Sequence, residues 1–175
     1  MPSSLAKIAM SIPLIVGGHS LGHVNAGDEK GYRVDIHPST LSEKIIPNYR
    51  GEKGQEAPVM PDNADRSYIE GGGIAGQDKL ADTLGPESNL VNAIYKIGYL
   101  FGFPDLVTNE PGDFRRMEQF KGHTAKKVMQ GAVLASAIED LYKAKTGKGL
   151  LGKNSDLKFW TSDTGAPGLL YSKRF

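Results

Sequence analysis

The sequence predicts one mainly α-helical domain with a loop-rich N-terminal half and an apolar N-terminal segment. In the second half, residues 89–101 and 124–144 repeat apolar side chains at the three- and four-residue spacing of helices with a buried face. The length of 175 residues fits a single domain. The 22 glycines and 10 prolines exceed average usage, which indicates long irregular connections.

The N-terminus has the order of a secretory signal peptide. Lys7 precedes an uncharged run of 11 residues, 8–18, and a more polar stretch ends at Val24-Asn25-Ala26. The sequence therefore predicts a signal peptide over 1–26, cleavage before Gly27, and a location in the cell envelope or periplasm. Two alternatives stay open, an uncleaved segment that contacts a membrane through residues 5–24 and a helix or strand of the protein core.

Residues 27–86 form a loop-rich acidic region. The alternation over 32–36 predicts a short strand, and 41–46, stopped by Pro47, predicts a brief helix. Residues 48–65 show little periodicity. A short helix is expected over 75–84, where Gly85-Pro86 ends it.

Residues 87–175 form a helical, net basic region that builds one compact domain with 27–86. Ser88 is the expected N-cap of the helix over 89–101, and Asp113 that of a further helix. Residues 1–112 carry nine basic and 14 acidic side chains, whereas 113–175 carry 12 and six. This asymmetry favours two halves that fold against each other and neutralise their charges.

The helix over 124–144 has two apolar sides. Leu134, Ile138 and Leu141 form a large apolar stripe, so we expect a helix enclosed by the core. Small side chains on its other side allow a second backbone to approach closely, and they are the predicted interaction face: Gly131, Ala132, Ala135 and Ser136.

The C-terminal segment mixes basic and aromatic side chains. This basic-aromatic tail comprises Lys158, Phe159, Trp160, Lys173 and Arg174. Such mixtures stack on nucleic-acid bases or lie at membrane interfaces. We favour a tail that folds back with Trp160 in the core, and nucleic acid is not an expected partner.

The run Gly18-His19-Ser20-Leu21-Gly22 resembles the nucleophile elbow of α/β-hydrolases. Asp105 or Asp113, followed by His123, would complete the order of a catalytic triad. An elbow serine follows a central strand, however, and only 17 residues precede Gly18. A serine hydrolase is therefore a remote alternative, and no catalytic residue is predicted.

The run 71–76 matches the G-x-G-x-x-G pattern of dinucleotide sites. The polar residues 66–70 do not form the buried strand that such a site requires. We interpret the run as a flexible turn, and no cofactor is predicted.

Metal ligands are sparse in this sequence. It has no cysteine and four histidines, His19, His23, His37 and His123. His19 and His23 would share one face of a helix, but Gly22 is expected to weaken that helix. The sequence analysis therefore predicts no metal site.

These observations together predict a non-catalytic, envelope-associated or assembly protein that acts by binding. A small exported bacterial protein is favoured, with a protein partner or larger assembly. The alternative is a structural subunit of a larger particle, such as a virion or a membrane complex.

Overall fold

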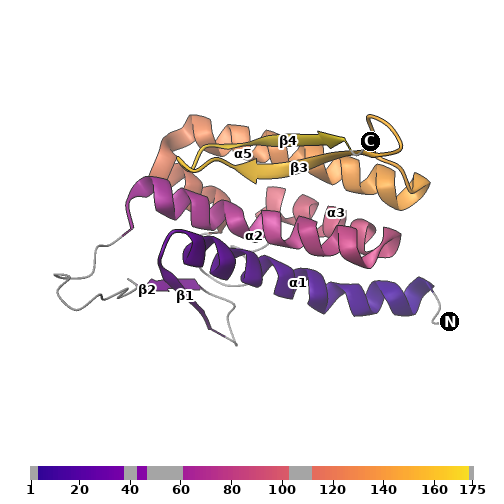
Figure 1. Cartoon of the computed structure of the whole chain (residues 1–175), viewed down its shortest axis with the longest axis horizontal. Coiled ribbons are helices and arrows are strands. Elements are labelled where there is room, and N and C mark those ends of the chain that lie inside the picture. The colour runs from indigo at the N-terminus through magenta and orange to yellow at the C-terminus, as the bar shows by residue number, and fades with distance from the viewer. Residues whose placement is uncertain (1–3, 38–42, 47–60, 103–111, 174–175) are drawn as a thin grey trace.

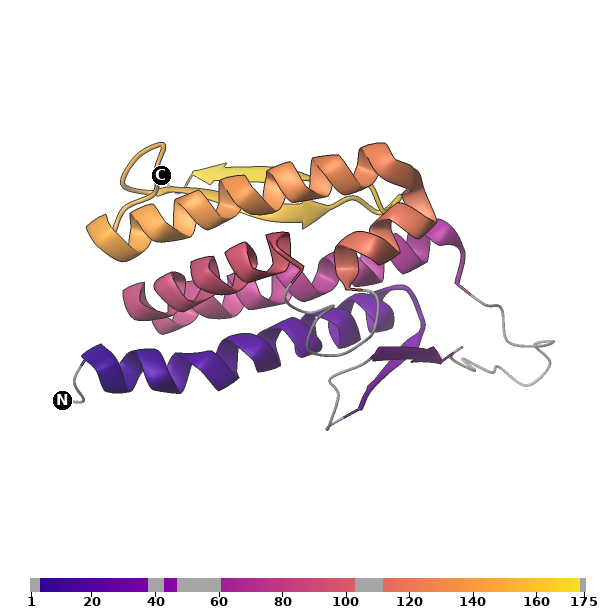
Figure 2. The same ribbon diagram turned by 180° about the vertical axis from the view of Figure 1, so that it is seen from behind.

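A computed structural model describes residues 4–37, 43–46, 61–102 and 112–173. These residues form the helices α1 (Ser4–Glu29), α2 (Asn63–Leu84), α3 (Pro86–Leu100) and α5 (Asp113–Thr146). They also form the hairpins β1 (Arg33–Ile36) with β2 (Glu43–Ile46), and β3 (Ser155–Thr161) with β4 (Pro167–Lys173). Figure 1 shows α2 and α3 between α1 on one side and α5 with β3–β4 on the other, and Figure 2 shows the same order from behind. The predicted mainly helical class is confirmed.

Helix α1 contributes a full face to the core. Its buried positions recur at the spacing of one helix face and include Ile15, His19, His23 and Ala26. By length and composition α1 could cross a membrane, a property that core helices and signal sequences share. Cleavage before Gly27 stays a prediction, and it would remove this face from the fold.

Glycines bring α1 and α2 into backbone contact. A Cβ atom placed on Gly76 would lie 2.5 Å from the Cα atom of Gly22 and 2.5 Å from the carbonyl oxygen of Gly18. The interpretation of residues 71–76 as a flexible turn was therefore wrong, because the run lies inside α2. Close packing offsets the helix-propensity cost of about 1 kcal/mol per glycine.

The acidic region contains more regular structure than the sequence predicts. The strand at 32–36 is confirmed as β1, but the brief helix at 41–46 was wrong because residues 43–46 form β2. In this antiparallel pair Val34 lies opposite Ile45, and both pack on the cluster formed by Ala26 and Ile69. The predicted helix over 75–84 is the second half of α2, and residues 47–60 lie outside the described residues.

The helices of the second half begin at glycines instead of the predicted caps. The helix over 89–101 is confirmed as α3, but its N-cap is Gly85, and buried Ser88 places its Oγ 2.7 Å from that of Ser11. The two predicted helices after residue 112 form α5, whose N-cap is Gly112, with a kink at Gly122. The positive φ of 85° at Gly122 is a conformation that glycine adopts without strain.

One side of α5 is open to solvent. Leu134, Ile138 and Leu141, expected in the core, are 48%, 47% and 39% exposed, because the described elements pack on the opposite side of this helix.

The predicted interaction face of α5 is partly buried and partly exposed. Ala132 and Ser136 are buried, Ala135 is half-buried and Gly131 is exposed. Contact of this face with a partner stays a prediction.

The basic-aromatic tail forms the β3–β4 hairpin. Alternation along β3 places Phe159 in the core and leaves Trp160 45% exposed, so the expected burial of Trp160 was wrong by one residue. Lys158 pairs with Asp82 and Asp156. Lys173 lies in β4, and Arg174 is outside the described residues.

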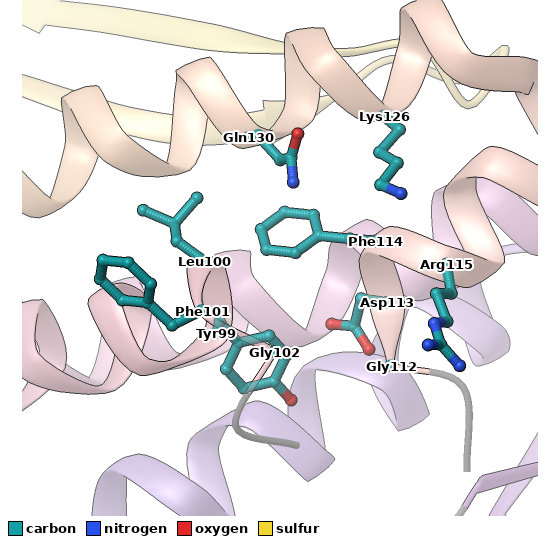
Figure 3. Close-up of a pocket in the computed structure, with 10 residues that line it drawn as sticks. All are labelled: Tyr99, Leu100, Phe101, Gly102, Gly112, Asp113, Phe114, Arg115, Lys126 and Gln130. Carbon is teal, nitrogen blue, oxygen red and sulfur yellow. The ribbon is translucent and has the colours of Figure 1, made fainter. Parts of the chain in front are cut away.

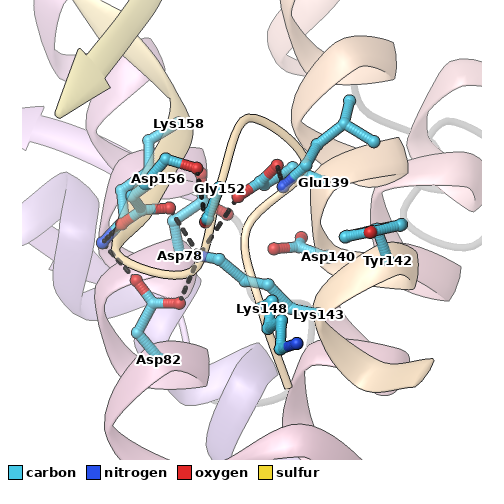
Figure 4. Close-up of polar contacts among 12 residues, drawn as sticks. Asp78, Asp82, Glu139, Asp140, Tyr142, Lys143, Lys148, Gly152, Asp156 and Lys158 are labelled. Atoms are coloured by element: carbon cyan, nitrogen blue, oxygen red, sulfur yellow. Dashed lines mark hydrogen bonds and ion pairs between the residues drawn. The ribbon is translucent and has the colours of Figure 1, made fainter. Parts of the chain in front are cut away.

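Ion pairs join the acidic and basic halves, as the charge distribution predicted. Lys143 of α5 donates to Asp82 of α2 at 3.0 Å and also bonds Asp156 of β3, as Figure 4 shows. Arg116 of α5 pairs with Glu70 of α2 at 3.2 Å. These contacts attach the hairpin and α5 to α2.

A second ion cluster lies deeper, between α2, α3 and α5. Lys96 is 1% exposed, binds Asp140 at 2.7 Å and also pairs with Asp78. Asn92 donates to both carboxylates at 2.8 Å. Burial raises the pKa of Asp140 to about 7, although the charge of Lys96 opposes the shift.

Candidate metal centre

Two histidines and a carboxylate meet in the interior where α1 approaches the start of α5. The Nε2 atoms of His19 and His23 lie 3.0 Å apart. The Oδ2 atom of Asp113 is 3.4 Å from Nε2 of His19 and 3.9 Å from Nε2 of His23. All three side chains are buried. Among the described residues this is the group whose ligand atoms could hold a metal ion.

Three helices create the space for this cluster. His19 and His23 are one helical turn apart on the buried face of α1. Opposite them stands Gly73 of α2, where a Cβ atom would lie 2.7 Å from the Cε1 atom of each imidazole. Asp113 is the first residue of α5. The glycine run of α2 therefore provides room for the two rings.

Hydrogen bonds fix the orientation of both imidazoles. Nδ1 of His23 is 2.8 Å from the carbonyl oxygen of Ile69, and Nδ1 of His19 is 2.9 Å from Oε1 of Gln77. Both oxygens accept hydrogen bonds, so each Nδ1 atom carries the proton and donates. In the neutral rings both Nε2 atoms are then unprotonated, and they lie 3.0 Å apart. A cation placed between them would contact both nitrogens.

The contacts at Nδ1 are those expected around a metal site. Histidine ligands of metals usually donate their second ring N–H to a carbonyl or carboxylate oxygen, which holds the ring in place. For a tetrahedral ion with metal–nitrogen distances near 2.05 Å, ligand atoms lie about 3.3–3.4 Å apart. The three separations in the cluster, 3.0, 3.4 and 3.9 Å, bracket this value.

Aromatic side chains from α3 border the cluster. The hydroxyl of Tyr99 is 2.7 Å from Nε2 of His19, and its ring centroid is 5.0 Å from that of the imidazole. The ring of Tyr95 lies 5.9 Å from the same imidazole, measured between centroids. Because Nε2 of His19 carries a lone pair, the Tyr99 hydroxyl is the donor in this contact.

The other histidines and the proposed nucleophile lie elsewhere. His37 and His123 are exposed, and Nδ1 of His123 is 2.8 Å from Oε1 of Glu118. Ser20 lies within α1 and not on a turn from strand to helix, so the likeness to a nucleophile elbow does not extend to structure. The interaction face and the basic-aromatic tail contribute no residue to the cluster.

The sequence drew attention to the spacing of His19 and His23, but no metal site was predicted there. His19 and His23 have the i, i+4 spacing of a shared helix face, and α1 continues through Gly22 despite the expected weakening. Asp113 was interpreted as a helix cap. Its position in the sequence carries no signal of its contact with α1.

No family model, curated protein or solved structure matches this chain. The fold and the site define it as a helical protein with a buried two-histidine, one-carboxylate cluster.

Proposed function

We propose that the protein acts by binding a divalent transition-metal ion through His19, His23 and Asp113. The observation that carries this proposal is the pair of Nε2 atoms, which face each other at 3.0 Å while both Nδ1 atoms donate elsewhere. A metal ion between them would bind both nitrogens together with the carboxylate of Asp113, in place of the hydrogen bond that Tyr99 donates to His19.

The ligand types indicate which metals would bind. Imidazole nitrogen suits zinc, iron, copper and nickel, and a carboxylate is compatible with zinc and iron(II). Two histidines and one carboxylate leave coordination positions for water or another ligand. The site is therefore suited to Zn²⁺, or to Co²⁺ as its spectroscopic substitute.

Metal analysis of the full chain tests this proposal. After treatment with a chelator, the protein is dialysed against Zn²⁺ and its bound metal is measured. We expect one ion per chain in the wild type, and loss of that ion in His23→Gln and Asp113→Asn. The matched control is His123→Gln, because His123 is exposed and outside the cluster.

Thermal denaturation provides a second measurement. An ion that binds only the folded chain stabilises it by about 4 kcal/mol at a thousandfold excess over its dissociation constant. Zn²⁺ should raise the melting temperature of the wild type and of His123→Gln, but not that of His23→Gln. Equal binding by all three proteins would refute the assignment.

A second proposal concerns where the protein acts. Much of the outer side of α1 is apolar and exposed, with Leu5 at 78%, Met10 at 63% and Leu21 at 60%. This distribution supports the envelope-associated or assembly protein favoured by the sequence, in the cell envelope or periplasm, with a virion or membrane-complex subunit as the alternative.

The intact mass of the protein in soluble and membrane fractions of its native source tests this location. A full-length chain in the membrane or particle fraction would support attachment through α1. A soluble chain that begins at Gly27 would show export with cleavage, and it would lack His19 and His23. A full-length chain confined to the soluble fraction would contradict this second proposal.

A further inference from the structure

A cavity borders the metal-ligand cluster. It has a volume of about 390 Å³ and lies between the end of α3 and the start of α5, as Figure 3 shows. Tyr99 and Asp113 line it, and both also contact His19. Tyr99 and Asp113 are 8% and 5% exposed, whereas His23 is 0% exposed. The cavity therefore borders the cluster at Tyr99 and Asp113, and neither histidine lines it.

The charges around this cavity favour an anion. A divalent ion held by two neutral imidazoles and one carboxylate leaves a net charge of about +1 at the centre. Arg115 and Lys126 line the same cavity, and the N-terminal end of α5 at Gly112 adds the positive end of a helix dipole. Lys126 also pairs with Glu118 at 2.6 Å.

The Tyr99 hydroxyl provides a donor for that anion. Without metal it donates to the lone pair on Nε2 of His19. A metal ion bound at Nε2 would occupy this lone pair. The Tyr99 hydroxyl would then be able to donate its proton to an anion bound to the same metal ion. An oxygen atom of an oxyanion accepts such a proton.

We infer that the metal centre binds a small oxyanion, a carboxylate or phosphate group, which enters through this cavity and receives a hydrogen bond from Tyr99. The inference rests on the proposed function. The metal supplies one bond to the anion and the Tyr99 hydroxyl the second contact. Leu100, Phe101 and Phe114 give the cavity apolar surface, and Gln130 adds a further polar side chain to its lining.

The experiment uses the full chain loaded with Co²⁺, whose visible spectrum reports changes in its ligands. Acetate is titrated at constant ionic strength set with perchlorate. We expect a saturable spectral change in the wild type. Tyr99→Phe should retain Co²⁺ but bind acetate at least about tenfold more weakly, since a hydrogen bond to a charged group contributes about 1.5–3 kcal/mol.

Tyr95→Phe is the matched control, because Tyr95 also neighbours His19 but does not line the cavity. It should bind acetate like the wild type. A wild-type Co²⁺ spectrum that acetate does not change would overturn the inference and leave the metal site intact. Equal acetate affinity in Tyr99→Phe and wild type would overturn the role of Tyr99. Failure to bind Co²⁺ at all would refute the proposed function itself.

Discussion

The glycine contact between α1 and α2 makes a quantitative prediction for Gly76→Ala. The new Cβ would lie 2.5 Å from the Cα atom of Gly22, whereas carbon atoms in contact lie 3.5–4.0 Å apart. Both nearest obstructing atoms belong to backbone, so the helices must separate by about 1 Å. A gap of that size loses a quarter to a half of the dispersion energy at each affected contact.

The free energies can be compared with a control on α5. Overpacking lowers stability by about 1–3 kcal/mol. The upper end applies here because backbone atoms, unlike a side chain, cannot change rotamer to avoid the new Cβ. Alanine returns about 0.5–1 kcal/mol of helix propensity. Gly76→Ala should therefore lose about 2 kcal/mol of stability, a fall of about 4–8 °C in melting temperature. Gly131→Ala should gain about 0.5–1 kcal/mol, since no atom lies within 4 Å of its Cβ.

Urea denaturation followed by circular dichroism measures both variants, with a chelator present to remove metal. The two substitutions are chemically identical and both lie within helices, so their difference isolates the α1–α2 contact. If Gly76→Ala is as stable as Gly131→Ala, α1 does not pack on α2 as described.

Three further predictions concern the buried charges and the N-terminus. Lys96→Met should lower the free energy of unfolding by about 3–5 kcal/mol in urea denaturation, because Asp78 and Asp140 would lose their buried cation. Adding Asp78→Asn and Asp140→Asn to the same chain should restore part of that free energy. The raised pKa of Asp140, about 7, means that the folded chain keeps a proton which the unfolded chain releases above about pH 4. The stability that this group contributes should be present below pH 4 and lost as pH rises through 7. Over that range the free energy of unfolding of Asp140→Asn should therefore rise relative to that of the wild type. A difference between the two proteins that does not change with pH would contradict the raised pKa. A chain that begins at Gly27 should bind no Co²⁺ by metal analysis, and full binding would exclude His19 and His23 as ligands.

The sequence predicts local structure where one segment carries the whole signal. The periodicity over 89–101 and the alternation over 32–36 were sufficient for α3 and β1. The brief helix at 41–46 failed because pairing with β1 and burial of Val34 outweighed local propensity. The open side of α5 was missed because an apolar stripe does not reveal whether another element covers it.

The sequence indicated only part of the candidate site. The glycine pairs Gly18–Gly22 and Gly72–Gly76 both have the i, i+4 spacing of closely packed helices. This spacing was overlooked because the two runs also resemble a nucleophile elbow and a nucleotide-binding pattern. Recognising them would have placed His19 and His23 on the inner face of α1. Asp113 lies 90 residues beyond His23, and only the tertiary fold brings it to them.

The long separation of α1 from its partners has a consequence during synthesis on the ribosome. Helix α1 ends at Glu29 and α2 at Leu84, so 55 further residues must be added before the surface of α2 on which α1 packs is complete. At about 5–20 residues per second this takes about 3–11 s. During that interval the nascent chain presents an apolar N-terminal helix before its partner α2 is complete. A targeting factor that recognises apolar helices would have this interval in which to bind α1, so slower translation would favour targeting over folding.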